Sequence, residues 1–274
     1  MLLGGILLLA AVAAVLLCLG TGNWWLLPVW LVASAVLLVA LAFGFLWFTC
    51  QIVDTSKPQT HDSKFYRTML GVYINFLVPV LGIRIHTAGT EKIPQEGRFL
   101  LVSNHLHEAD PAILMRTFPK SQLAFISKRE AGSMFLVGKI MHKLLCQPIN
   151  RENDREALKT ILKCIQLIKD DEVSVAVFPE GYIRDNRKLH HFRHGVFKIA
   201  IKAKVPIVVC TLQNTHRIIA NALKLKPTDV HLHLLDVIRP EEYAGMTTVE
   251  LSEKIYNMMA DDLGPELVAQ EQNA

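Results

Sequence analysis

Residues 100–111, LLVSNHLHEADP, contain the features that decide the fold. The apolar run at their start has the composition of a buried strand. The polar loop after it ends at Asp110-Pro111, a pair typical of the start of a helix. The stretch therefore predicts a strand, a loop and a helix in direct succession, with Asp110 as the N-cap residue.

The same alternation continues along the chain after this unit. Apolar, strand-like runs occupy residues 99–104, 123–127, 173–178, 205–212 and 230–238. Helical patterns begin at Pro111 and cover residues 132–145, 155–168, 196–202 and 248–263. This order predicts an α/β fold, with a largely parallel or mixed sheet covered by helices on both faces. In such folds, ligands gather at the carboxyl ends of the strands.

The N-terminal part has a different composition. No Asp, Glu, Lys, Arg or His occurs from Met1 to Val53. Two apolar runs, Leu2–Leu19 and Trp24–Cys50, are each long enough to cross a hydrocarbon layer of about 30 Å as a helix, and the short polar link between them predicts a transmembrane hairpin. A single span followed by an interfacial helix is the alternative. The basic residues that follow, Lys57, Lys64 and Arg67, favour a cytoplasmic location for the remainder of the chain.

These patterns predict three parts. Residues 1–53 are the transmembrane helical hairpin, residues 54–90 an interfacial segment that seats the protein on the membrane, and residues 91–274 the α/β domain. Within the middle part, the apolar stretch Met69–Ile83 is short for a span and contains Pro79. It is expected in the membrane interface, with a buried core helix as the alternative.

Charge and cysteine content narrow the classes of partner. The formal net charge of +4 suits a protein that approaches anionic lipid or phosphorylated substrates. No known nucleic-acid recognition motif is present, so nucleic acid is not an expected partner. The five cysteines lie far apart, mostly in apolar segments, and are expected to be buried thiols.

His105 and Asp110 are the candidate catalytic residues. On a continuous helix, residues five apart lie about 140° round from each other, but across a loop that turns into a helix they can meet. A carboxylate on one imidazole nitrogen makes the other a competent general base towards a hydroxyl group. The alternative is that Asp110 only caps a helix and His105 is an ordinary loop histidine. A second polar turn, Phe178-Pro179-Glu180-Gly181, follows another strand and favours the catalytic interpretation.

Several ordered motifs between Arg98 and Leu212 resemble those of the glycerolipid acyltransferases, specifically the 1-acyl-glycerol-3-phosphate acyltransferase family. The motifs are Asn104-His105-x4-Asp110, Lys128-Arg129-Glu130, Asn150-Arg151, Phe178-Pro179-Glu180-Gly181 and Val205-Pro206-Ile207.

The resemblance implies a membrane acyltransferase. Its substrates would be acyl-CoA or an acyl carrier protein and the acceptor 1-acyl-sn-glycerol 3-phosphate (lysophosphatidic acid), its setting a lipid bilayer, and no metal or other cofactor is expected. His105 and Asp110 would be the catalytic dyad. The implied substrate-binding residues are Asn104, Lys128, Arg151, Glu180, Gly181 and Arg184. Glycerol 3-phosphate or another lysolipid is the alternative acceptor, and a non-catalytic lipid-binding protein of the same fold is the alternative from another class.

One motif departs from the family pattern. The usual Pro-Glu-Gly-Thr-Arg is here Pro179-Glu180-Gly181-Tyr182-Ile183, and an arginine follows only at position 184. A shift of one residue can turn a side chain to the other face of an extended segment, which makes Arg184 a weaker candidate than Lys128 or Arg151.

Two further patterns are weaker. The basic segment 184–198, with interleaved phenylalanines, is interpreted as a solvated loop, with contact to anionic headgroups or donor phosphates as its functional alternative. His231 and His233 point to one face of a predicted strand. They are expected to pack there rather than bind a metal, because the sequence offers no third ligand.

Overall fold

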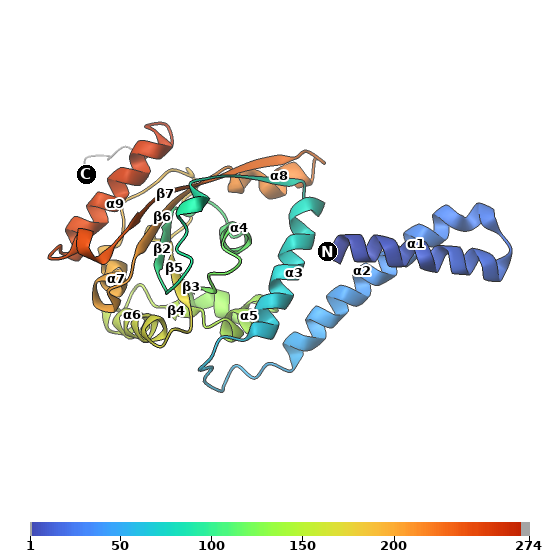
Figure 1. Cartoon of the computed structure of the whole chain (residues 1–274), viewed down its shortest axis with the longest axis horizontal. Coiled ribbons are helices and arrows are strands. Elements are labelled where there is room, and N and C mark those ends of the chain that lie inside the picture. Colours follow the sequence, from blue (N-terminus) through green and yellow to red (C-terminus); the bar gives the residue numbers. More distant parts are fainter. Residues whose placement is uncertain (1, 270–274) are drawn as a thin grey trace.

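A computed structural model describes residues 2–269 as an apolar helical hairpin attached to an α/β domain (Figure 1). Met1 and residues 270–274, the outer ends of two of the expected parts, lie outside the described residues. The hairpin consists of α1 (Leu2–Thr21) and α2 (Leu27–Gln51), joined by the 3-10 turn η1 (Trp24–Leu26). Pro28 lies in the first turn of α2, where its missing N–H costs no helical hydrogen bond.

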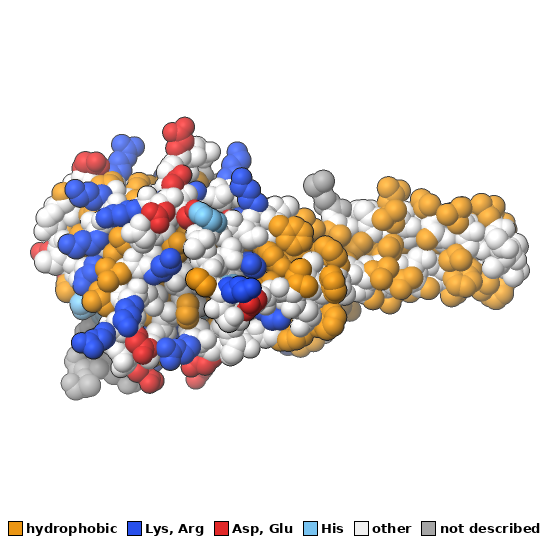
Figure 2. All heavy atoms as spheres, turned by 90° about the horizontal axis from the view of Figure 1, so that it is seen from below, with side chains coloured by type: hydrophobic (Ala, Val, Ile, Leu, Met, Phe, Trp, Pro, Cys, Tyr) orange, Lys and Arg blue, Asp and Glu red, His pale blue; other side chains and the backbone are white. Residues whose placement is uncertain are grey.

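Both hairpin helices are long and apolar enough to cross a membrane, with mean hydropathies of 2.9 and 2.6. Most of their large apolar side chains are exposed, among them Leu8, Trp25 and Val36. Figure 2 shows the contrast: hydrophobic side chains run along the hairpin, while the basic and acidic side chains lie on the domain. Exposed apolar surface of this extent is typical of a membrane-facing segment.

Helix α3 (Lys64–Val80) lies between the hairpin and the domain (Figure 1). It begins five residues before the predicted apolar stretch, because the Ser63 hydroxyl caps it by accepting a hydrogen bond from the Tyr66 N–H. Two tyrosine hydroxyls join α3 to α2: Tyr66 donates to the Thr49 carbonyl at 2.7 Å and Tyr73 to the Ala42 carbonyl.

The sheet has seven strands in the order β1-β7-β6-β2-β5-β3-β4. All neighbouring strands run parallel except β6 and β7, which are antiparallel. The predicted α/β class with a mixed sheet is confirmed. The strands are β1 (Ile83–Ala88), β2 (Leu100–Ser103), β3 (Leu123–Lys128), β4 (Gln147–Ile149), β5 (Ser174–Val177), β6 (Ile207–Gln213) and β7 (Thr228–Ile238).

Helices cover both faces of the sheet, because the central strands are apolar on both sides. In β2, Leu100 and Val102 pack in a core with α6, α7 and α9, whereas Leu101 packs in a core with α4 and α8. The domain helices are α4 (Asp110–Thr117), α5 (Val137–Lys143), α6 (Asp154–Lys169), α7 (Lys198–Ala203), α8 (Ile218–Ala222) and α9 (Thr248–Leu263). Short 3-10 turns are η2 (Thr90–Lys92), η3 (Arg129–Ser133), η4 (His194–Phe197), η5 (Thr215–Arg217) and η6 (Pro240–Tyr243).

One predicted helix is divided. Residues 132–145 were expected to form a single helix, but the chain forms η3 and then α5, with an extended backbone at Met134 between them. Gly132 and Gly138 lie on either side of this break, and glycine is a poor former of helix interiors.

The cysteines are free thiols. Cys18, Cys50, Cys164 and Cys210 are buried. Cys146 is partly exposed as a residue but its thiol is buried, which agrees with the prediction of buried thiols. Burial raises the pKa of the Cys146 thiol to about 11 and that of Cys164 to about 12.

Candidate active site

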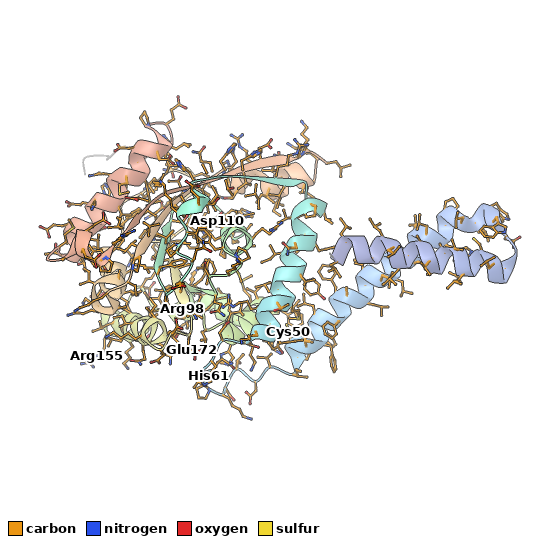
Figure 3. All side chains as sticks on the ribbon, in the orientation of Figure 1. Cys50, His61, Arg98, Asp110, Arg155 and Glu172 are labelled. Atoms are coloured by element: carbon orange, nitrogen blue, oxygen red, sulfur yellow. The ribbon has the colours of Figure 1, made fainter. Side chains whose placement is uncertain are left out.

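The loop between β2 and α4 brings His105 and Asp110 together. The His105 Nδ1 atom lies 2.8 Å from Asp110 Oδ2. The Asp110 side chain is fully buried and the His105 side chain is 17% exposed, so the pair faces solvent only through the imidazole. Figure 3 shows Asp110 inside the domain, at the start of α4.

Asp110 is the first residue of α4, and Ala109 occupies the N-cap position. The prediction that Asp110 is the N-cap residue is therefore wrong by one position. The difference matters, because the carboxylate bonds to the loop before the helix instead of to the first turn. Its Oδ2 atom accepts from the backbone N–H groups of Leu106 at 2.7 Å and His107 at 2.9 Å, besides contacting His105.

Two contacts orient the imidazole of His105: Asp110 bonds to its Nδ1 atom, and Phe178 packs against its ring face. Its ring stacks on the ring of Phe178, with centroids 4.0 Å apart and an interplanar angle of 10°. A carboxylate can only accept, so the neutral imidazole carries its proton on Nδ1 and a lone pair on Nε2. Among residues 2–269, Nε2 has no hydrogen-bond partner. The arrangement therefore presents one oriented basic nitrogen.

Glu180 connects the two polar turns. Its Oε1 accepts from the His105 backbone N–H and its Oε2 from the His190 backbone N–H, both at 2.9 Å. The residue is 4% exposed, and burial is the main cause that raises the pKa of its carboxyl to about 7. Gly181, with φ of +82°, allows the turn after β5 to reverse. Since both oxygens of Glu180 bond to main chain, this residue positions the loop that carries His105.

Asn104 is also occupied by main chain. Its amide oxygen accepts from the Leu212 N–H at 2.7 Å, and its amide nitrogen donates to the Leu212 carbonyl at 2.9 Å. The side chain is buried. It thus joins the end of β2 to β6, and it fixes where the loop with His105 begins.

The predicted phosphate-binding residues divide into two sets. Lys128 ends β3 and is exposed, with its Nζ atom 3.8 Å from Glu130. Arg151 follows β4, and Arg184 lies in the loop after β5; both guanidinium groups lie against the ring of Tyr182, at 4.9 Å and 5.4 Å from its centroid. The structure therefore brings Arg184 to the same place as Arg151, in spite of the shifted motif.

Sequence reasoning missed three contributors. Phe178 supports the His105 ring, Arg187 donates to the Leu106 carbonyl at 2.6 Å, and the Arg193 guanidinium lies 5.4 Å from the Tyr182 centroid. Phe178 lay inside a recognised motif. The two arginines lay in the basic segment, where their spacing gave no sign of which would turn inward.

The histidines on β7 make separate contacts. His231 stacks on His86 with centroids 5.0 Å apart, and His233 Nδ1 lies 2.6 Å from Asp262 Oδ1. Within the described chain, no group of three or more His, Cys, Asp or Glu side chains is arranged to hold a metal ion.

The sequence also matches a family model and several known proteins. Residues 84–213 match the family model described as Acyltransferase. The chain is 30% identical over 165 residues to a Mycoplasma pneumoniae protein named "Probable 1-acyl-sn-glycerol-3-phosphate acyltransferase", a match that covers 59% of each chain. It is 31% identical over 150 residues to the Homo sapiens 1-acyl-sn-glycerol-3-phosphate acyltransferase alpha, covering 54% of this chain and 50% of the human one. The match thus spans only half to three-fifths of the length of these relatives.

The fold is similar to the crystal structure of the 1-acyl-sn-glycerophosphate (LPA) acyltransferase, PlsC, from Thermotoga maritima. The TM-score is 0.62 at 19% sequence identity, covering 84% of this chain and 90% of that one. At this identity the likeness supports the fold. The family match and the curated relatives support the resemblance inferred from the motifs.

Proposed function

From the match of residues 84–213 to the acyltransferase family model, we propose that the chain acylates the sn-2 hydroxyl of 1-acyl-sn-glycerol 3-phosphate. The acyl donor is a thioester, acyl-CoA or an acyl carrier protein, and the product is phosphatidic acid. The names of its relatives support the acceptor. The observation that carries the proposal is the His105–Asp110 pair, whose second imidazole nitrogen is free to take a proton.

The reaction follows from this pair. The Nε2 atom of His105 removes the proton of the acceptor hydroxyl as its oxygen bonds to the thioester carbonyl carbon. The carbon–sulfur bond then breaks, and the imidazolium returns the proton to the leaving thiolate. Buried Asp110 stabilises the imidazolium and keeps the ring orientation. General base assistance of this kind contributes on the order of 10² to 10⁴ in rate.

The other residues of the candidate site support this reaction indirectly. Asn104 and Glu180 fix the loop that carries His105, and Gly181 permits the adjoining turn. Lys128, Arg151 and Arg184 lie at the carboxyl edge of the sheet and neutralise substrate phosphate. The acceptor is itself a membrane lipid, and an apolar hairpin beside the domain would hold the site at the bilayer surface.

Substitution of His105 tests the mechanism. His105→Ala is expected to lower kcat/KM for acyl transfer by at least about 100-fold, because the hydroxyl loses its proton acceptor. His86→Ala is the matched control, since His86 lies on β1 with its side chain half exposed. Near-normal transfer by the His105 variant in native membranes would show that the mechanism is wrong.

A panel of acceptors tests the substrate. Purified protein with acyl-CoA is expected to release free thiol when 1-acyl-sn-glycerol 3-phosphate is present, and much less with glycerol 3-phosphate or with lysolipids that carry other headgroups. Lipid mass spectrometry identifies the product. Faster acylation of another acceptor would show that this acceptor, and not 1-acyl-sn-glycerol 3-phosphate, is the substrate. Absence of thiol release with every acceptor and donor would contradict catalysis.

A further inference from the structure

Three guanidinium groups converge on the ring of Tyr182. The Cζ atoms of Arg151, Arg184 and Arg193 lie 4.9 Å, 5.4 Å and 5.4 Å from the ring centroid. Arg151 lies in the loop after β4, whereas Arg184 and Arg193 both lie in the connection between β5 and η4. A cation within about 6 Å of an aromatic centroid is attracted by the ring quadrupole. One aromatic side chain therefore lies beside three charges that come from two loops.

Within the part of the chain that the structure describes, no salt bridge neutralises these three charges. Within residues 2–269, none of the three guanidinium groups forms an ion pair with an Asp or Glu side chain. Burial lowers the pKa of Arg151, and the neighbouring charge of Arg193 lowers it further, whereas the nearby Tyr182 and Glu130 act in the opposite direction. Like charges brought together in this way favour binding of an anion, because an anion removes their mutual repulsion.

The backbone around Tyr182 is shaped to admit the arginines. A side chain at Gly181 would place its Cβ atom 3.3 Å from Arg193 Cδ and Nε and 3.8 Å from Arg151 Nε. Arg193 Nη1 also donates to the Arg151 carbonyl at 3.3 Å. The cluster is thus packed against the turn, with Arg151 partly buried and with Tyr182, Arg184 and Arg193 exposed to solvent.

The cluster adjoins the catalytic pair through the same turn. The Arg193 N–H donates to the Pro179 carbonyl at 2.8 Å, and the next residue, Glu180, accepts from the His105 N–H. An anion bound at Tyr182 would therefore lie beside the loop whose histidine acts on the hydroxyl.

We propose that Tyr182 is a positioning residue whose ring holds Arg151, Arg184 and Arg193 as one binding site for a phosphate monoester dianion of a substrate. The inference rests on the proposed function for the identity of the substrate, and it adds Arg193 and Tyr182 to the binding residues. The aromatic residue that breaks the family pattern at position 182 then explains how the displaced Arg184 still contributes. Phosphate monoesters occur in the lysolipid acceptor and in the nucleotide part of acyl-CoA, so the test must separate these two sources.

Kinetics of two matched variants test the role of the ring. Tyr182→Phe keeps the aromatic face and Tyr182→Leu removes it at similar size. Tyr182→Phe is expected to stay within about twofold of the parent in both kcat and KM. Tyr182→Leu is expected to raise KM for the substrate that carries the phosphate about tenfold, equivalent to about 1.4 kcal/mol, while kcat stays within about threefold. A purely structural loss would reduce the amount of active enzyme and so lower kcat.

The substrate whose KM rises identifies the source of the phosphate. A rise for the lysolipid assigns the site to the acceptor, and a rise for acyl-CoA assigns it to the donor. No rise for either in Tyr182→Leu, or an equal rise in Tyr182→Phe, would overturn the role of the ring. Arg193→Gln is expected to raise the same KM. Arg155→Gln is its matched control, because Arg155 is exposed on α6 at the outer edge of the domain (Figure 3).

Binding of glycerol 3-phosphate separates this inference from the proposed reaction. Isothermal titration of the His105→Ala variant in detergent is expected to show binding that weakens several-fold when Tyr182→Leu is added. Such binding supports the anion site even if every acyl-transfer assay fails. If acyl transfer proceeds while glycerol 3-phosphate binds equally with and without the ring, the anion site is overturned and the reaction stands.

Discussion

At the scale of single residues, Glu180 gives the protein a pH-dependent stability. Burial raises the pKa of its carboxyl from the ordinary value of 4.5 to about 7. Folding therefore disfavours ionisation of this group. The stability that it contributes is fully present below about pH 4.5 and is lost as the pH rises to about 7.

Glu180→Gln removes this titration. We expect the unfolding midpoint of the parent protein to fall relative to that of the variant between about pH 5 and about pH 8. Thermal unfolding of both proteins across this range measures the difference between their midpoints. The glutamine can shift the midpoint by a fixed amount, but that amount does not change with pH and does not affect the comparison. Glu152→Gln, at an exposed position, controls for the change in charge. Parallel curves for the parent and Glu180→Gln would contradict the assignment.

Within the candidate site, a contact between residues close in the sequence was easier to predict than a contact between distant strands. The spacing of His105 and Asp110 was sufficient to predict that they meet, because only the loop before α4 had to turn. The hydrogen bonds between the Asn104 side chain and the Leu212 backbone form only because β6, more than a hundred residues later, lies beside β2. Contacts of this kind follow from strand order, which local patterns do not contain.

At the scale of elements, Arg67 of α3 joins this helix to the sheet and forms a buried ion pair with Asp62. Arg67 donates through Nε and Nη2 to the two oxygens of Asp62, both at 2.7 Å, and through Nη1 to the Leu123 carbonyl at the start of β3. The side chains are only 14% and 5% exposed. Loss of one partner would leave the other charge buried and unpaired.

Arg67→Met is therefore expected to lower the free energy of unfolding by about 3 to 5 kcal/mol. The double variant Asp62→Asn, Arg67→Met is expected to lose less, because no buried charge remains alone. Denaturant unfolding in detergent measures both. A double variant as unstable as Arg67→Met would contradict this account.

The break between η3 and α5 depends on a close backbone approach. A Cβ atom at Gly138 would overlap the Gly132 carbonyl, whereas a Cβ atom at Gly132 meets nothing within 4 Å. Gly138→Ala is expected to destabilise the fold by about 1 to 3 kcal/mol through overpacking, and Gly132→Ala to leave stability nearly unchanged. Thermal unfolding compares the two. A Gly138 variant as stable as the Gly132 variant would contradict the contact.

Elements with strong end signals were predictable. The limits of α9 agree with the prediction, since Thr247 and Glu250 form a capping box and Gly264 follows the last turn. No such signal marked the start of α5, where two glycines lie among residues with little preference for a helix. Its tertiary contact with Gly132, which the sequence does not show, decides the break.

At the scale of the whole molecule, the hairpin predicts a topology. If α1 and α2 both cross the bilayer, the turn at Asn23 and the segment at Lys57 lie on opposite sides. Both positions are exposed. The basic residues beside the second helix favour the cytoplasm for Lys57.

Single cysteines introduced at these positions test the topology. In sealed vesicles, a membrane-impermeant maleimide is expected to label Lys57→Cys only from the cytoplasmic side and Asn23→Cys only from the other. The parent chain gives the background of its own cysteines. Labelling of both positions from one side would favour the alternative of a hairpin that does not cross.

The order of strands in the sheet was only partly predictable from the sequence patterns. Alternating strands and helices predicted a largely parallel sheet, and most pairs agree. The antiparallel β7 enters between β1 and β6 because a short helix, α8, allows the chain to return directly beside β6. The pattern of β7 also differs, since its residues alternate between buried and exposed.

The position of β7 has a consequence for biosynthesis. Ile83 of β1 pairs with Thr228 of β7, a partner that the ribosome adds about 145 residues later. At ordinary rates of translation, this delay is on the order of ten seconds or more. The nascent chain therefore exposes its apolar N-terminal helices well before the edge strand finds its neighbour. Insertion of these helices into a lipid layer would precede completion of the sheet. The bilayer would then cover their apolar surface while the last strand is still being synthesised.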